Sequence, residues 1–301
     1  GSSDSTVQIA QRYGAKVYHY KWNDDFAAAR NESLKYCTGD WVLYLDADER
    51  LAPESVQHLL NYISQAENEV SALICLIESP HSLINGGSEM HRGGYPRLFR
   101  NYGYPNISFR GRVHEQITPS LIDLKKSIAV SDIKIIHLGY NQSREVMEQK
   151  IKRNYTMLLA HVNEEPLNGY AWFQLGQTLG QMNLKKEAED AIRMAIDCGD
   201  LSGSIMASAA AALSQFCGDR RDFAEALAWA EKSLEIAPNQ VYGNVLKAYA
   251  LHFLGRSNEA LDYFAKAKDL KVKKSSMPMS GFDIDLSDEM IDKGIKMAMG
   301  R

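Results

Sequence analysis

The chain has few cysteines and no long hydrophobic run. Its 301 residues include four cysteines that lie far apart and form no C-x-x-C pair, namely Cys37, Cys75, Cys198 and Cys217. This spacing excludes a disulfide scaffold and favours a reduced, cytoplasmic compartment. No apolar run reaches the ~18 residues typical of a membrane span, and no signal-peptide pattern is visible. We therefore expect a cytoplasmic chain without a transmembrane segment.

The sequence also lacks an excess of positive charge. It has 34 lysines and arginines against 38 aspartates and glutamates, which gives a net charge of −4. Because nucleic-acid binding relies on clustered positive charge, we expect no nucleic-acid partner. Hydrophobic residues make up 45% of the chain and charged residues 24%, which are ordinary proportions for a globular protein. The length predicts about two domains.

The first 140 residues alternate short apolar runs with amphipathic stretches. This alternation predicts β-α units, and therefore an α/β domain with a mostly parallel sheet. Residues 78–118 are richer in glycine and aromatic residues and contain two shorter strand pieces, Arg97–Arg100 and Val113–Thr118. The other predicted strands are Ala15–Tyr20, Trp41–Leu45, Ala72–Ile77 and Ile128–Leu138, and the predicted helices are Ser5–Tyr13, Asp25–Cys37 and Pro53–Gln65.

After Asn141 the pattern becomes helical. A long amphipathic helix is predicted over Arg144–Val162. Three alanines then occupy equivalent points of a repeated pattern, with 38 residues from Ala188 to Ala226 and 34 from Ala226 to Ala260. A period near 34, with small residues where two helices cross, is typical of tetratricopeptide repeats.

Residues 168–272 accordingly resemble the tetratricopeptide repeat family. The second unit carries about four extra residues near Gly218–Arg221, and Ser287–Met299 predicts one more amphipathic helix. We therefore predict an α/β domain over 1–140, a connecting helix within 141–167, repeats over 168–272 and a capping helix within 273–301. The first repeat matches the family pattern at Trp172, Leu175, Gly176, Ala188 and Ala195.

Two carboxylates follow a predicted buried strand in the run WVLYLDADER. Asp46 and Asp48 are two residues apart, so in an extended chain they project to one side. Open α/β sheets bind ligands at the carboxyl ends of their parallel strands. Paired carboxylates there suit a hard divalent cation such as Mg²⁺ or Mn²⁺. The alternative is that these residues and Glu49 only cap the helix predicted from Pro53.

The sequence around this pair resembles glycosyltransferase family 2, whose members have the GT-A fold. The matching segments are Ala29-Arg30-Asn31, Gly39-Asp40-Trp41 and Asp46-Ala47-Asp48. The run Trp22–Phe26 resembles the branch of the family that often carries repeats behind the catalytic domain. The resemblance covers about residues 1–155. It implies a fold of α/β plus all-α type, with a GT-A domain followed by repeats. It also implies a nucleotide-sugar donor, for which a UDP-sugar is the leading candidate.

The resemblance also implies a metal site. Asp48 matches the residue that ligates Mg²⁺ or Mn²⁺ directly, and Asp46 matches a partner that reaches the ribose or the metal shell. His137, in the run His137–Tyr140, matches a histidine that can complete the site. A divalent cation stabilises the negative charge that grows on a departing nucleoside diphosphate. For His137 alone, an ordinary hydrogen-bonded histidine at a strand end is the alternative.

Glu115 is the candidate catalytic base. It ends the run Gly111-Arg112-Val113-His114-Glu115, and the resemblance implies that its carboxylate removes the acceptor's proton in an inverting transfer. The alternative is that Glu115 forms a surface ion pair with Arg110 or Arg112.

Three further residues are candidates for donor binding through the same resemblance. Arg97, in a P-R-L-F-R segment, offers bidentate donors to diphosphate oxygens. Arg30 is expected to hold the nucleotide or the D-x-D loop, and Asp4, in Gly1–Thr6, matches part of the nucleotide pocket. The alternative for Arg97 is a structural arginine that braces the sheet, and the alternative for Arg30 is a solvated ion pair on the helix surface.

Members of this family normally begin with a strand, a helix and a second strand before the segment that matches Gly1–Thr6. We therefore expect the first unit of the GT-A domain to be missing. The favoured function is an inverting, metal-dependent glycosyltransferase with a protein, peptide or glycan acceptor, whose repeats bind the acceptor or a partner or mediate self-association. A repeat-based binding scaffold with an inactive transferase domain is the alternative, and a nucleotidyltransferase is a weaker third.

Overall fold

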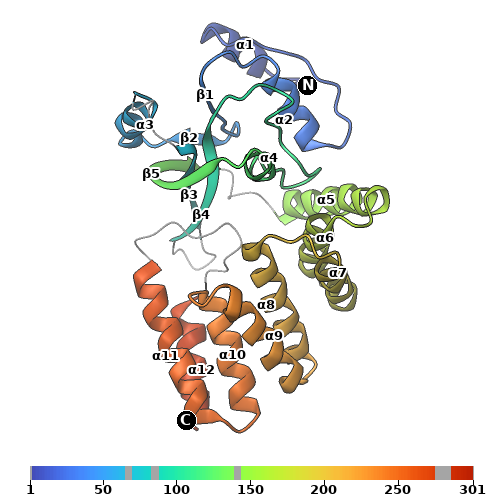
Figure 1. Ribbon diagram of the computed structural model, residues 1–301, viewed down its shortest axis with the longest axis vertical. Helices are drawn as coiled ribbons and strands as arrows, with labels where there is room; N and C mark the ends of the chain where they lie inside the picture. Colours follow the sequence, from blue (N-terminus) through green and yellow to red (C-terminus); the bar gives the residue numbers. More distant parts are fainter. Residues whose placement is uncertain (1, 65–69, 83–87, 139–143, 275–285, 301) are drawn as a thin grey trace.

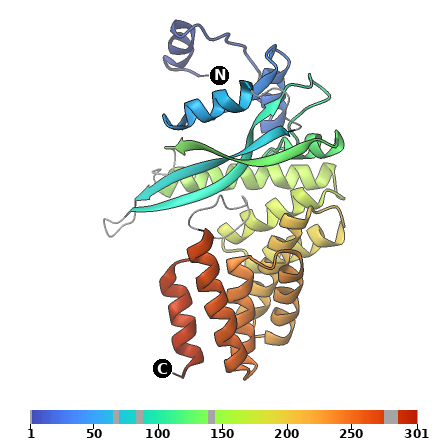
Figure 2. The same cartoon turned by 60° about the vertical axis from the view of Figure 1, so that its left-hand side comes forward.

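The computed structural model describes residues 2–64, 70–82, 88–138, 144–274 and 286–300. A sheet with surrounding helices forms the N-terminal part, and an array of helices forms the remainder (Figure 1). Turning the molecule by 60° shows the same two parts, with the C-terminus at the end of the array farthest from the sheet (Figure 2). The predicted fold class, α/β plus all-α, is therefore confirmed.

The sheet is mixed and has the strand order β1-β4-β3-β5-β2. Strands β3 and β5 are parallel, whereas β1 with β4, β4 with β3, and β2 with β5 are antiparallel. The prediction of a mostly parallel sheet is wrong, because the glycine-rich run after residue 77 continues one long strand and returns as its antiparallel neighbour. The bounds are β1 Trp41–Leu43, β2 Glu49–Leu51, β3 Val70–Ser82, β4 Ser88–Arg100 and β5 Ser127–His137.

Two predicted strands are absent from the described residues. Ala15–Tyr20 has no regular secondary structure and pairs with no strand there, and the Tyr18 ring instead stacks on that of Tyr36, with 3.6 Å between ring centroids. The segment Val113–Thr118 forms no strand either. Its chain makes a single antiparallel bridge between Arg110 and Gln116 and then enters helix α4, Thr118–Asp123. An apolar run becomes a strand only where a partner edge is available.

The predicted N-terminal helices are present as α1 (Thr6–Arg12), α2 (Phe26–Leu34) and α3 (Ser55–Ser64). Helix α2 begins where the Asp25 carboxylate accepts a 2.8 Å hydrogen bond from the Ala28 backbone N–H. Its Asn31 side chain donates to the Phe109 carbonyl (2.9 Å) and accepts from the Phe109 N–H (2.7 Å). These two bonds fix α2 against the chain that leads to residues 110–116.

Three helix pairs follow a long connecting helix, as the repeat pattern predicts. Ala188, Ala226 and Ala260 are at most 2% exposed within these pairs. Helix α8 has 17 residues whereas α6 and α10 have 13 each, so the extra residues of the second unit add about one turn to its first helix. The bounds are α5 Arg144–Glu164, α6 Gly169–Gln181, α7 Lys185–Asp197, α8 Gly203–Asp219, α9 Phe223–Ile236, α10 Val241–Phe253, α11 Ser257–Lys274 and α12 Asp288–Ala298.

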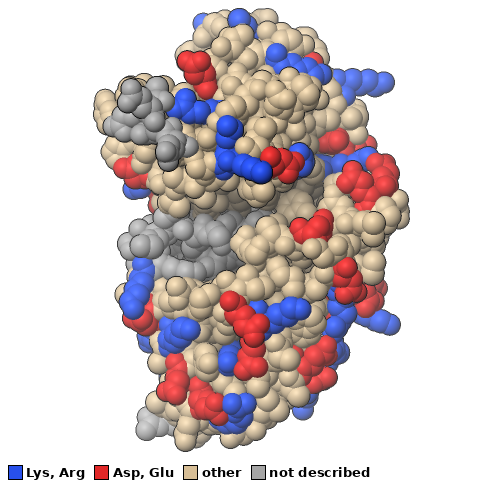
Figure 3. Space-filling model, viewed as in Figure 1, with Lys and Arg blue, Asp and Glu red and all other residues tan. Residues whose placement is uncertain are grey.

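Charged side chains of both signs are mixed over the face drawn in Figure 3, on the sheet region and on the helices alike. Among the helices of the described residues, none is long and apolar enough to cross a membrane. The final helix α12 buries Ile291 and Gly294 against the preceding pair, as expected of a helix that covers the end of the array.

Gly176→Ala is expected to destabilise the protein, because a Cβ at this position would lie 2.6 Å from Ile192 Cδ1 and 3.2 Å from the Ala188 carbonyl oxygen. Overpacking of this kind costs about 1–3 kcal/mol, more than the gain in helix propensity. Gly180→Ala in the same helix is the matched control, because nothing lies within 4 Å of its Cβ position. Thermal unfolding should show a lower midpoint for Gly176→Ala and an unchanged or higher one for Gly180→Ala; equal midpoints would contradict the packing described here.

Candidate active site

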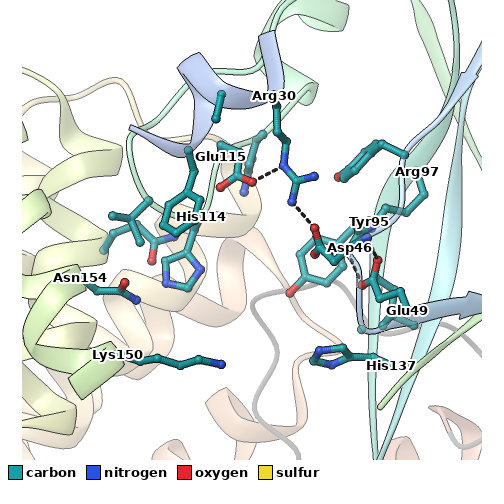
Figure 4. Close-up of a pocket in the computed structure, with 18 of the residues that line it drawn as sticks. Arg30, Asp46, Glu49, Tyr95, Arg97, His114, Glu115, His137, Lys150 and Asn154 are labelled. Atoms are coloured by element: carbon teal, nitrogen blue, oxygen red, sulfur yellow. Dashed lines mark hydrogen bonds and ion pairs between the residues drawn. The ribbon is translucent and has the colours of Figure 1, made fainter. Parts of the chain in front are cut away.

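A cavity of about 960 Å³ lies between the sheet and helices α5 and α6. Figure 4 shows side chains from both parts facing it, with Arg30, Asp46, Arg97 and His137 from the sheet part opposite Lys150 and Asn154 of α5. The chemically relevant lining residues are Arg30, Tyr44, Asp46, Glu49, Ser79, Tyr95, Arg97, His114, Glu115, Gln116, His137, Lys150, Arg153, Asn154, Tyr170, Gln174 and Gln177.

A tight turn after β1 carries the D-x-D pair. The Glu49 N–H donates to the Asp46 carbonyl (3.0 Å), and the Asp46 N–H donates to the Glu49 carboxylate (2.8 Å). Glu49 is buried as the first residue of β2. The alternative that these residues cap helix α3 is therefore wrong for Glu49, which instead closes the turn that presents Asp46 and Asp48.

The register of β2 against β5 brings Asp48 next to His137. Glu49 lies opposite His137 in this antiparallel pair, and the Leu138 N–H donates to the Asp48 carbonyl at 2.9 Å. His137 Nε2 then lies 3.3 Å from Asp48 Oδ2, and its Nδ1 lies 3.1 Å from the Ser79 hydroxyl. The structure thus brings together two residues that the sequence separates widely, while Gly139 and Tyr140 of the same motif fall outside the described residues.

Arg30 joins two loops across the top of the cavity. Its guanidinium donates to both Asp46 and Glu115 (Figure 4). The Tyr44 ring contacts two cations, with centroid distances of 5.0 Å to Arg30 Cζ and 4.4 Å to Arg97 Cζ. The predicted surface pairs of Glu115 do not form, because Arg110 pairs with Asp123 and Arg112 with Glu164.

Arg97 is buried in the cavity wall. Its Nη2 lies 2.7 Å from Glu49 Oε1 and 3.8 Å from Asp46 Oδ2. Its Nε and Nη1 have no hydrogen-bond partner among the described residues. Buried N–H groups without a partner carry a free-energy cost, so this guanidinium is suited to donate hydrogen bonds to an anionic oxygen of a ligand.

The charges around the turn shift several pKa values. Burial alone would raise the pKa of Asp46, but attraction to Arg30 and then Arg97 outweighs it, and the pKa lies below its usual value. Burial raises the pKa of Tyr44 to about 12, against the opposing effect of the two arginines. Desolvation lowers the pKa of His114. At neutral pH the cavity therefore holds an ionised Asp46, a neutral Tyr44 and a neutral His114.

Most of the predicted site residues share this cavity. Asp46, Arg30, Arg97, Glu115 and His137 line it, and Asp48 adjoins it through His137. Asp4 lies apart, at the start of α1, where its carboxylate accepts hydrogen bonds from the Thr6 N–H (3.0 Å) and hydroxyl (2.6 Å).

Sequence reasoning missed Tyr44, the buried role of Glu49, and the whole wall that α5 and α6 contribute. The position of Glu49 directly behind the D-x-D pair was a usable signal. Nothing local in the sequence connects Lys150 or Tyr170 with residues of the sheet, so that wall becomes visible only in the fold.

Three metal-ligating side chains do not come together anywhere in the described part of the chain. Asp48 and His137 form a pair instead. Such a pair is compatible with Mg²⁺ or Mn²⁺, which often use one or two protein ligands and complete their shell with water and substrate phosphates. The donor set therefore fits a cation that arrives with, or is completed by, a phosphate ligand.

Comparison with known proteins agrees with this arrangement. The sequence pattern described as glycosyl transferase family 2 matches residues 1–115, and that of the tetratricopeptide repeat matches residues 242–271. Residues 1–115 are a family 2 glycosyltransferase domain. The matched range includes Arg30, the D-x-D pair, Arg97 and Glu115, whereas His137 and the α5 and α6 wall follow it.

Several curated proteins are similar to this chain. A TPR repeat-containing protein of Synechococcus elongatus is 32% identical over 66% of this chain and 49% of its own length. The SPbeta prophage-derived glycosyltransferase SunS of Bacillus subtilis is 27% identical over 65% of this chain and 45% of its own length. An uncharacterized glycosyltransferase of Rickettsia conorii is 30% identical over 50% of this chain and 54% of its length. The chain spans about half the length of these relatives.

Arg30→Met is expected to lower the thermal midpoint at pH 7, with a cost of about 2 kcal/mol, because two carboxylates lose their shared cation. Since the folded pKa of Asp46 is lowered, its stabilisation is complete above the unfolded value of about 3.8 and is lost as the pH falls through the folded value. The difference between wild type and variant should therefore shrink below about pH 4. Arg50→Met, at an exposed residue of β2, is the control. A difference that is the same at pH 3 and pH 7 would contradict the ion-pair account.

Proposed function

We propose that the protein is an inverting, metal-dependent glycosyltransferase that transfers a sugar from a nucleotide-diphosphate donor, with a UDP-sugar the first candidate. The observation that supports this most is that Asp46, His137 and Glu115 line one cavity, with Asp48 paired to His137 beside it. The family 2 domain over residues 1–115 supports the same reaction class.

The cavity suits an anionic donor. Arg97, whose Nε and Nη1 have no hydrogen-bond partner among the described residues, lines it from the sheet, and Lys150 extends into it from α5 (Figure 4). Arg153 adds a further cation on the same helix. Arg30 is already shared by two carboxylates, so Arg97 and Lys150 are the groups that would contact the diphosphate oxygens.

Asp48 and His137 would hold the Mg²⁺ or Mn²⁺, with donor phosphate oxygens and water completing its shell. When bound, the cation supplies Lewis-acid stabilisation of the departing nucleoside diphosphate. The contact of His137 Nδ1 with the Ser79 hydroxyl orients the ring so that Nε2 faces Asp48. The turn closed by Glu49 presents Asp46 beside this pair, in reach of the donor's ribose.

Glu115 is proposed as the catalytic base. Arg30 binds its Oε1, which leaves Oε2 to take the proton from the acceptor hydroxyl. The acceptor oxygen then forms a bond to the anomeric carbon as the bond from that carbon to the diphosphate breaks, which inverts the configuration. The proton ends on Glu115 and the electron pair on the nucleoside diphosphate.

The acceptor is proposed to be a protein, peptide or glycan that enters beside the helical repeats. Stacked repeats build extended surfaces for such partners, or for a second copy of the chain. The polar side chains that α6 adds to the cavity wall support an acceptor bound partly by the repeats. A cytoplasmic location stays a prediction from the cysteine usage.

Asp48→Ala is expected to reduce the metal-dependent affinity for UDP at least tenfold, because it removes the carboxylate ligand. Titration calorimetry of UDP with Mn²⁺ measures this. The control is Asp132→Asn. Asp132 forms a similar pair with His58, with 2.7 Å between Oδ2 and Nδ1, and neither residue lines the cavity. Wild-type protein that binds neither UDP nor GDP with Mn²⁺ would favour the binding scaffold over the enzyme.

Glu115→Gln is expected to lower kcat by about 10²–10⁴ and to leave the donor dissociation constant within a few-fold, because a base acts in the chemical step. Nucleoside diphosphate release from UDP-sugars and GDP-mannose measures kcat. The control is Glu54→Gln, at an exposed glutamate near Lys134. Unchanged kcat, or a product that retains the donor configuration, would exclude the role proposed for Glu115.

A further inference from the structure

The loop that carries Glu115 belongs to the sheet region in sequence but packs into the helical array. Val113 is 3% exposed and lies in a hydrophobic cluster with Met157 and Leu158 of α5 and Leu175 of α6. Arg112, its neighbour, pairs with Glu164 at the end of α5. The residues just before its tip are thus anchored by helices that lie outside the family 2 match.

A single hydroxyl group on α6, that of Tyr170, forms hydrogen bonds with the residues on both sides of Glu115. Tyr170 donates to the His114 carbonyl at 2.9 Å and accepts from Gln116 Nε2, also at 2.9 Å. It accepts a third hydrogen bond, of 2.8 Å, from Gln174 Nε2 one turn along the same helix. These bonds use the one donor and both acceptor positions of a phenol oxygen. The residues before and after Glu115 are therefore tied to the same atom.

The loop needs such an anchor because its backbone is strained. His114 has a φ of +55°, a left-handed conformation that a non-glycine residue adopts only at a cost. Gly111, at the other end, has a φ of +96°, and a Cβ there would lie 3.5 Å from the Tyr170 ring. Within the sheet region, the backbone bridge between Arg110 and Gln116, the hydrogen bond from the Phe26 N–H to the Arg112 carbonyl (3.0 Å) and the Arg30 contact restrain the loop.

We propose that Tyr170 is a positioning residue that holds the Glu115 loop in its working conformation, so that the first repeat helix completes the active site. Tyr170 acts through the His114 carbonyl and the Gln116 amide and does not need to touch the reacting atoms. This inference rests on the proposed function for the part that Glu115 plays in the reaction. The geometry of the loop itself does not depend on it.

Tyr170→Phe removes the hydroxyl and keeps the ring. Tyr242→Phe is a matched control, because Tyr242 is also the second residue of the first helix of a repeat and its hydroxyl donates to Gln215 on a neighbouring helix. Hydrogen–deuterium exchange on the full chain measures the stability of the loop's backbone directly. We expect exchange in peptides that cover 110–117 to increase about tenfold in Tyr170→Phe and to stay unchanged in Tyr242→Phe.

The catalytic readout separates positioning from general destabilisation. Tyr170→Phe should lower kcat about tenfold, because the loop carries the proposed base Glu115. It should leave the dissociation constant of UDP with Mn²⁺ within twofold, because the donor-binding residues Arg97 and Asp48 lie outside the loop. Tyr242→Phe, with a similar change in thermal midpoint, should leave both constants unchanged. A loss of kcat that is equal in the two variants would overturn the proposal.

Failure of this inference and of the proposed function can be told apart. If wild-type protein shows no nucleotide binding or turnover, the proposed function fails, and loop exchange still decides whether Tyr170 holds residues 110–117. If wild-type protein turns over and Tyr170→Phe matches it in both kcat and loop exchange, the transferase stands and the positioning role is excluded.

Discussion

The candidate site depends on one positively charged side chain, that of Arg30. Arg30, on the helix that Asp25 caps and Asn31 anchors, binds a carboxylate from the D-x-D turn and another from the loop before α4. Without it, two carboxylates would face one cavity and repel each other. The same guanidinium lies over the Tyr44 ring, which the Arg97 guanidinium also contacts. Placing α2 therefore places Asp46, the proposed base Glu115 and the proposed phosphate-binding residue Arg97 relative to one another.

A second constraint is the register between two short segments of strand. Because Glu49 lies opposite His137, the residue before Glu49 reaches the imidazole. A slip of one residue would turn these side chains to the opposite face of the sheet. Glu49 itself is buried, closes the preceding turn and pairs with Arg97. Two of the sequence-predicted candidates, Asp48 and Arg97, thus depend on a residue that was interpreted only as a helix cap.

The elements that the sequence predicted well are those with local causes. Helix α2 starts at a capping aspartate. In the repeats, small buried residues such as Ala188 and Ala226 recur at a regular spacing because two helices cross there. Strand pairing has no such local cause. The run Ala15–Tyr20 has the composition of a strand but no partner edge in the described residues, whereas the glycine-containing run before Arg97 becomes half of a long hairpin.

The same distinction applies to the site. The D-x-D pair, Arg97 and Glu115 were visible because each stands in a short motif. Their environment was not, because Tyr170 and Lys150 come from helices that read in sequence as an independent repeat array. A motif search identifies residues that carry chemistry, and only the fold identifies residues that hold them in place.

The division into a catalytic domain and a repeat domain is therefore less sharp than the sequence suggests. Val113 contributes to the hydrophobic core of the helices, and the Tyr170 hydroxyl satisfies backbone and side-chain groups on both sides of Glu115. A loop with a left-handed His114 requires contacts that outweigh its strain, and helices α5 and α6 supply them. Any movement of the first repeat, for instance when a partner binds the array, would be transmitted to Glu115 through atoms in direct contact. If the repeats bind the acceptor and Glu115 takes its proton, as proposed, these two steps are linked through a single packed interface.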